Sequence, residues 1–92
     1  MNNEPKKING LTEGRMVHYV LPDGKNAGEH RAAIVVRVFD HYEGTSNLSV
    51  FTDGSNDFIK GAPGWRGTLS ASSVLPDQTK KEPGTWHWIE HV

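Results

Sequence analysis

The sequence Ala-Ala-Ile-Val-Val-Arg-Val-Phe at residues 32–39 is the most continuous apolar stretch of this chain of 92 residues. Isoleucine and valine dominate it, and polar, turn-forming residues flank it on both sides. This composition is typical of a β-strand that is buried on both faces. We therefore expect the stretch to be the central strand, with the other segments paired to it or packed around it.

Four further segments show the alternation or the β propensity of strands. They cover residues 15–21, 48–52, 71–75 and 85–92, with Pro, Gly, Asn and Asp between them. These turn residues favour chain reversals, and no segment has a helical period. The sequence predicts an all-β fold: either a small five-stranded SH3-like barrel or a strongly twisted antiparallel sheet, with a long glycine-rich loop at residues 55–70.

The chain is small and nearly neutral. It has 10 basic and 11 acidic residues and no cysteine. The missing cysteines exclude disulfides and thiol nucleophiles and favour a reducing compartment. The charge balance argues against an extended nucleic-acid partner, which would need a surplus of Lys and Arg. Because no segment approaches the about 20 apolar residues of a membrane span, and residues 1–9 lack the apolar centre of a signal peptide, we expect a cytoplasmic protein without a membrane partner.

The length predicts one domain. We interpret the polar residues 1–10 as a flexible N-terminal arm and residues 11–92 as a single small β domain. Folding of so short a chain hides only about 60% of its surface, so the core is small. Association into a homo-oligomer is one way to bury more surface, and we expect this protein to form one.

Residues 87–91 read His-Trp-Ile-Glu-His, which matches the letters of the H-x-x-E-H zinc-peptidase motif. That motif needs a helix to place both histidines on one face, whereas Pro83 and Gly84 precede a β-prone run here. We therefore predict no metal site and no cofactor. As a strand, the run places Trp86 and Trp88 on one side, where they form either part of the core or a stacking platform for a ligand.

Other motifs also favour structural interpretations. The spacing of Asp53, Ser55 and Asp57 is that of the start of an EF-hand loop, but Phe58 stands where that loop needs glycine. A turn stabilised by its own side chains fits better. The glycines at residues 61–67 match no phosphate-binding fingerprint. Arg37, within the apolar run, either pairs with an acidic side chain or contacts a ligand.

The chain resembles a set of small phage- and prophage-encoded proteins of long-unassigned role. The resemblance rests on Gly-Arg-Met-Val-His-Tyr at residues 14–19, Ala-Ile-Val-Val-Arg-Val at 33–38, Asn-Leu-Ser-Val-Phe-Thr-Asp-Gly-Ser-Asn-Asp at 47–57 and Pro-Gly-Thr-Trp-His-Trp at 83–88. It implies a phage accessory protein that acts in the host cytoplasm. Near Ser70, where many relatives have an aromatic residue, the chain departs from the pattern.

Together, the resemblance and the residues predict a non-enzymatic, oligomeric protein that sequesters a small nucleotide-type signalling ligand of host defence. Aromatic rings would stack on a base, and Arg or His would contact phosphate. The candidate ligand-binding residues are His18, Tyr19, Arg37, Asp53, Asn56, Asp57, Trp65, Arg66, Trp86, His87 and Trp88. The alternative is a structural or adaptor protein that binds another phage or host protein through strand edges and Trp faces. An enzyme ranks third, and no catalytic residue is predicted.

Overall fold

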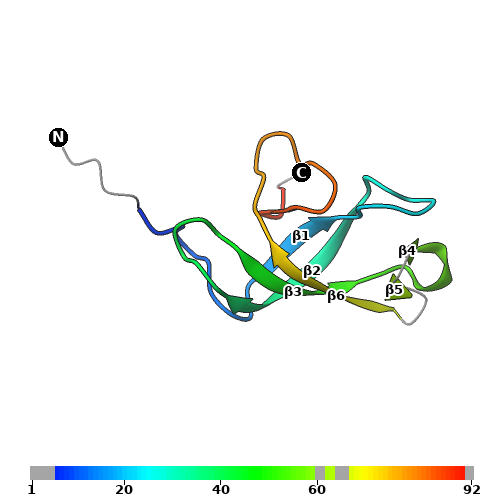
Figure 1. The fold of residues 1–92 in the computed structure, drawn as a ribbon, viewed down its shortest axis with the longest axis horizontal. Helices are drawn as coiled ribbons and strands as arrows, with labels where there is room; N and C mark the ends of the chain where they lie inside the picture. The colour runs from blue at the N-terminus through cyan, green and yellow to red at the C-terminus, as the bar shows by residue number, and fades with distance from the viewer. Residues whose placement is uncertain (1–5, 60–61, 64–66, 91–92) are drawn as a thin grey trace.

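A five-stranded antiparallel sheet forms the body of the molecule (Figure 1). The computed structural model describes residues 6–59, 62–63 and 67–90. The strands of the sheet are β1 (Met16–Val20), β2 (His30–Val38), β3 (Ser46–Phe51), β6 (Thr68–Val74) and β7 (Trp86–His87). Their order in space is β6-β3-β2-β1-β7, so β2 is the central strand, as predicted.

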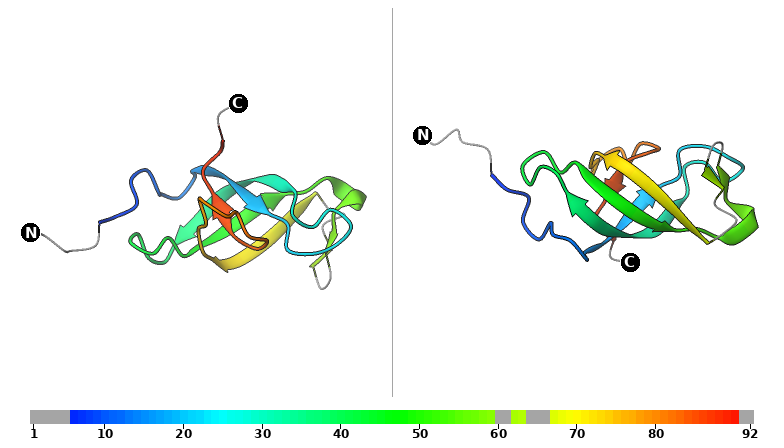
Figure 2. Two further views of the ribbon diagram at one scale, coloured as in Figure 1. Left: turned by 90° about the horizontal axis from the view of Figure 1, so that it is seen from above. Right: turned by 60° about the horizontal axis from the view of Figure 1, so that its bottom comes forward.

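The sheet stays open, so of the two predicted architectures the five-stranded antiparallel sheet is confirmed and the closed barrel is wrong. After β6 the chain crosses one side of the sheet through residues 75–85 and returns as β7 beside β1 (Figure 2). A single isolated bridge between Pro76 and Trp86 connects the two ends of the sheet. Because β7 has only two residues in the sheet, no ladder within the described part of the chain joins it to β6.

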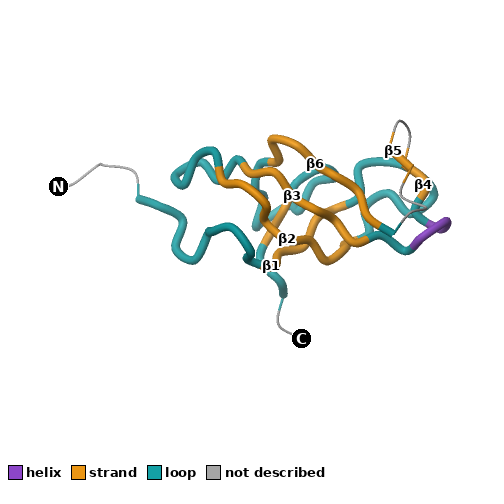
Figure 3. Tube along the Cα trace, turned by 90° about the horizontal axis from the view of Figure 1, so that it is seen from below, coloured by secondary structure: helices purple, strands orange, loops and turns teal. Residues whose placement is uncertain are grey.

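The glycine-rich loop contains short regular elements. It includes one 3-10 turn, η1 (Gly54–Asn56), and a two-stranded sheet of β4 (Phe58–Ile59) and β5 (Ala62–Pro63). Figure 3 shows these elements at one end of the molecule. Within the described residues, no helix is long and apolar enough to cross a membrane.

The core lies on one face of the sheet. Alternate residues of three adjacent strands point into it, as the period of two requires. Its buried apolar side chains are Leu11, Val17, Tyr19, Leu21, Ala33, Val35, Leu48, Val50, Ala71, Val74 and Trp86. Ile8 packs against this cluster and donates its backbone N–H to the His41 carbonyl at 2.8 Å. The predicted flexible arm, residues 1–10, therefore contacts the domain at Ile8.

Burial of β2 on both faces, which the apolar run predicted, is wrong. Val35 is 1% exposed, whereas Val36 is 56% exposed. No second layer covers the outer face of β2 in the described part of the chain. The register also shifts between Val35 and Arg37, where a bulge interrupts the pairing with β3.

Trp86 joins the core to the turn before β3. Its side chain is fully buried, and its Nε1 donates a hydrogen bond to the Gly44 carbonyl at 2.9 Å. Gly44 has a φ of +91°, and a Cβ there would lie 2.7 Å from Pro76 Cγ, so only glycine fits this close approach. The core alternative for Trp86 is therefore confirmed.

The two adjacent valines of β2 form a matched pair for a stability test. Val35→Ala is expected to lower the free energy of unfolding by about 2 kcal/mol, because it removes two buried methyl groups and leaves a cavity. Val36→Ala should change it by less than about 0.5 kcal/mol, because the side chain is largely in solvent. Urea unfolding measures both values. Equal losses would contradict the one-sided burial of the strand.

Candidate metal centre

Three histidines meet on the face of the sheet opposite the core. His18 lies on β1 and is directly opposite His87 of β7 in the register. His30 is the first residue of β2 and pairs with Val20, which shares a strand face with His18. Directly opposite and diagonal neighbours on one face of a sheet are close enough for their rings to meet. The strand register therefore brings the three imidazoles together.

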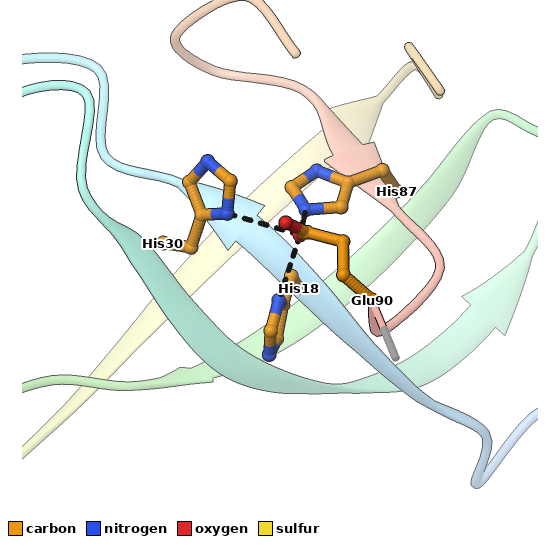
Figure 4. A group of neighbouring side chains, drawn as sticks. All are labelled: His18, His30, His87 and Glu90. Atoms are coloured by element: carbon orange, nitrogen blue, oxygen red, sulfur yellow. Dashed lines mark hydrogen bonds and ion pairs between the residues drawn. The ribbon is translucent and has the colours of Figure 1, made fainter. Parts of the chain in front are cut away.

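Glu90 completes the cluster from the segment that follows β7. Its Oε1 lies 3.3 Å from His18 Nδ1 and 3.1 Å from His30 Nδ1, and it is hydrogen-bonded to His87 Nε2. Figure 4 shows the three imidazoles pointing toward this one carboxylate. The three nitrogens and the oxygen all lie within 4.8 Å of one another. We call these four residues the His3Glu cluster.

Burial differs among the four side chains. His87 is fully buried, His18 and His30 are partly exposed, and Glu90 is the most exposed at 41%. The ring centroids of His30 and His87 are 4.5 Å apart, so packing of the rings orients them. His87 Nδ1 is buried without a hydrogen-bond partner among the described residues. Its other nitrogen, Nε2, is the one that faces the cluster.

The cluster favours neutral His87 and ionised Glu90. Burial lowers the pKa of His87, and the hydrogen bond that His87 donates to Glu90 opposes this only in part. For Glu90, partial burial acts to raise the pKa, but hydrogen bonds from His18 and His87 and the charge of Lys81 outweigh it and lower the pKa to about 2. A neutral imidazole and a carboxylate are the protonation states that bind metal ions.

Asp57 belongs to a separate, saturated network. Its side chain is fully buried, and Arg31 donates to it through Nε at 2.6 Å and Nη2 at 2.9 Å. Asn26 Nδ2 and the backbone N–H of Asp53 donate further bonds at 2.9 and 2.7 Å. The network links the loop before β2 to the turn after β3. Both carboxylate oxygens of Asp57 accept hydrogen bonds from the protein itself. This predicted ligand-binding residue therefore holds parts of the fold together.

Trp88 lines a shallow pocket near the His3Glu cluster. The Arg15 guanidinium lies 5.1 Å from the centre of its ring, and Trp86 contacts the ring edge-on at 5.0 Å. The pocket is lined by Gly14, Arg15, Met16, Trp88 and Ile89. Two lining residues are close in the chain to members of the cluster: Met16 shares a strand face with His18, and Ile89 precedes Glu90.

The structure brings together only some of the predicted ligand-binding residues. His18 and His87 meet, but Tyr19 and Trp86 belong to the core on the opposite face. Asp53 and Asn56 are hydrogen-bonded to each other at 3.2 Å near the Asp57 network. Arg37 is exposed, with its guanidinium 4.7 Å from the centre of the Phe39 ring. Trp65 and Arg66 lie outside the described residues.

Two members of the His3Glu cluster were absent from the predicted site. His30 stood in the loop expected before the central strand, and Glu90 belonged to a motif that was rejected because its context is not helical. The rejection of the helix is correct, since residues 88–90 follow a strand. Two residues of the motif, His87 and Glu90, nevertheless lie together in the His3Glu cluster.

Comparisons of the chain with protein-family models, with curated proteins and with solved structures return no match. The resemblance to phage-encoded proteins, the nucleotide-type ligand and the alternative adaptor role therefore stay predictions.

Proposed function

We propose that this protein binds one divalent transition-metal ion, best matched by zinc, through His18, His30, His87 and Glu90. The observation that supports this is the convergence of three imidazole nitrogens and one carboxylate oxygen within 4.8 Å. The four residues lie on three strands and on the segment that follows β7, up to 72 residues apart in the sequence. Two histidines alone often meet by chance, but four ligating groups with one common centre make a complete coordination set.

The donor set selects the class of metal. Three imidazoles and one carboxylate suit zinc and neighbouring transition metals, whereas calcium and magnesium need mostly oxygen ligands. In a tetrahedral zinc site, bonds of about 2.1 Å place neighbouring ligand atoms about 3.4 Å apart. The oxygen of Glu90 already lies 3.3 and 3.1 Å from two of the nitrogens. The Glu90 oxygen lies between the three nitrogens, so a shift of this carboxylate would make room for an ion that all four atoms can reach.

A metal at this position would link the shortest strand of the sheet, β7, to its neighbours. β7 contributes two residues and pairs with β1 through His18–His87 and Tyr19–Trp86 alone. Coordination by His18, His30 and His87 would link β7 to β1 and β2 on the face opposite the core. Small domains commonly compensate for a limited core with such a metal link.

Binding of zinc to the purified, metal-free protein, measured by competition with a chromophoric chelator, tests the proposal. We expect one ion per chain. His30→Ala should weaken the affinity by more than about 100-fold, because even residues that only support metal ligands contribute 10- to 100-fold. This variant is suitable because His30 is partly exposed and its loss leaves the core intact.

His41→Ala is the matched control, since His41 lies outside the His3Glu cluster. Its affinity for zinc should equal that of the wild type. If His30→Ala and His41→Ala bind zinc as the wild type does, the cluster is not the metal site.

A further inference from the structure

The four proposed ligands differ in how firmly the fold holds them. His18, His30 and His87 lie on strands, and the antiparallel ladders fix their backbone positions. Glu90 lies outside the strands, and its side chain is the most exposed of the four. A metal ion would thus have three ligands on a rigid sheet and one on the segment that follows β7.

Binding of an ion also requires the carboxylate to move. In the structure Glu90 Oε1 accepts a hydrogen bond from His87 Nε2. Hydrogen-bonded atoms of this kind lie about 2.8 Å apart, whereas two ligands of one zinc lie about 3.4 Å apart. The ion therefore replaces the hydrogen bond, and the carboxylate shifts outward, toward solvent. The other oxygen of the carboxylate, Oε2, lies 3.6 Å from Lys81 Nζ.

We propose that Glu90 is an exchangeable fourth ligand, and that a small carboxylate anion can take its place on the metal held by the three histidines. This inference rests on the proposed metal-binding function. Three histidines with one open position are a ligand set that binds anions or water at the metal. Met16 and Ile89, which are close in the chain to His18 and Glu90, line a pocket and add apolar surface. A carboxylate with a small apolar body would match both the open position and this surface.

Cobalt(II) is the probe for this exchange, because its visible spectrum reports the number and type of its ligands and it binds zinc sites. Acetate is titrated into the cobalt-loaded wild type, Glu90→Ala and Glu90→Gln. We expect acetate to change the visible spectrum of Glu90→Ala and Glu90→Gln. In the wild type one carboxylate replaces another, so binding of acetate is followed there by the broadening of its methyl proton NMR signal by the paramagnetic cobalt. In Glu90→Ala the affinity for acetate should be about tenfold or more higher than in the wild type, because no internal carboxylate competes, which corresponds to about 1.4 kcal/mol. Saturation of Glu90→Ala with acetate should restore a spectrum close to that of the acetate-free wild type.

Each other outcome overturns a defined part of the inference. An acetate methyl signal that the cobalt-loaded wild type does not broaden, with a response in Glu90→Ala, would show that Glu90 is a fixed ligand. Equal acetate affinities in the two proteins would show that Glu90 does not occupy the position. If Glu90→Ala holds cobalt but does not respond, the fourth position is closed to anions. If no protein binds cobalt or zinc, the proposed metal-binding function itself fails, and this inference fails with it.

Discussion

Zinc at a free concentration about 1,000 times its dissociation constant is expected to raise the free energy of unfolding by about 4.1 kcal/mol. The reason is that the four ligands meet only in the folded chain, where the register of β1, β2 and β7 brings them together. For a domain of this length, such a gain corresponds to a rise in the melting temperature of about 15 °C or more. Thermal unfolding followed by circular dichroism, with and without zinc, measures it.

Three comparisons identify the cause of the shift. Excess chelator should reverse it, His30→Ala should abolish most of it, and His41→Ala should preserve it. A shift of the same size in His30→Ala would mean that zinc stabilises the protein at another place. A lower melting temperature with zinc would mean that the unfolded chain binds the ion more tightly than the folded one, which contradicts a preformed site.

The strands were predictable because their signal is local. Alternation in β1 and β3 and the valine-rich run of β2 require only a period of two, and all three strands form where expected. Closure of the sheet has no such local signal. It depends on whether β6 and β7, at opposite edges, can pair, and the two-residue length of β7 prevents this. Burial of the outer face of β2 likewise has no local signal, because it depends on what packs against that face elsewhere in the fold. Val36, on β2, is exposed.

The His3Glu cluster was only partly predictable, for a related reason. His18 and Glu90 are 72 residues apart, and His30 becomes a neighbour only through its pairing with Val20. A shift of one residue in that register would turn the side chain to the other face of the sheet. The motif at residues 87–91 indicated the right chemistry but suggested a helical geometry. The actual arrangement uses strands, and its missing ligands come from β1 and β2.

Asp57→Ala is expected to be the most destabilising single change outside the apolar core, with a loss of about 3 kcal/mol or more in the free energy of unfolding. The substitution leaves the Arg31 guanidinium, the Asn26 amide and the Asp53 N–H without their acceptor. Arg31 is only 16% exposed, so water replaces the carboxylate poorly. Urea unfolding at neutral pH measures the loss.

Asp53→Ala is the matched control, because Asp53 is exposed and its carboxylate accepts one hydrogen bond, from Asn56. It should change the free energy of unfolding by about 0.5 kcal/mol at most. In a double-mutant cycle, Arg31→Ala with Asp57→Ala should cost clearly less than the sum of the two single changes, because each single change leaves a partner unpaired. Additive losses would show that the ion pair does not couple β2 to the turn after β3.

The same ion pair makes stability depend on pH in one direction. Hydrogen bonds from Arg31, together with those from Asn26 and Asp53, outweigh burial and hold the pKa of Asp57 far below its usual range. A carboxyl group in an unfolded chain titrates near pH 3.9. Because the folded pKa is the lower one, the contribution of Asp57 is complete above about pH 4 and decreases as the pH falls toward the folded value. The difference in unfolding free energy between the wild type and Asp57→Ala should therefore be smaller at about pH 3 than at pH 7. A difference that does not change with pH would mean that packing around Asp57, and not its charge, holds the turn after β3 against β2.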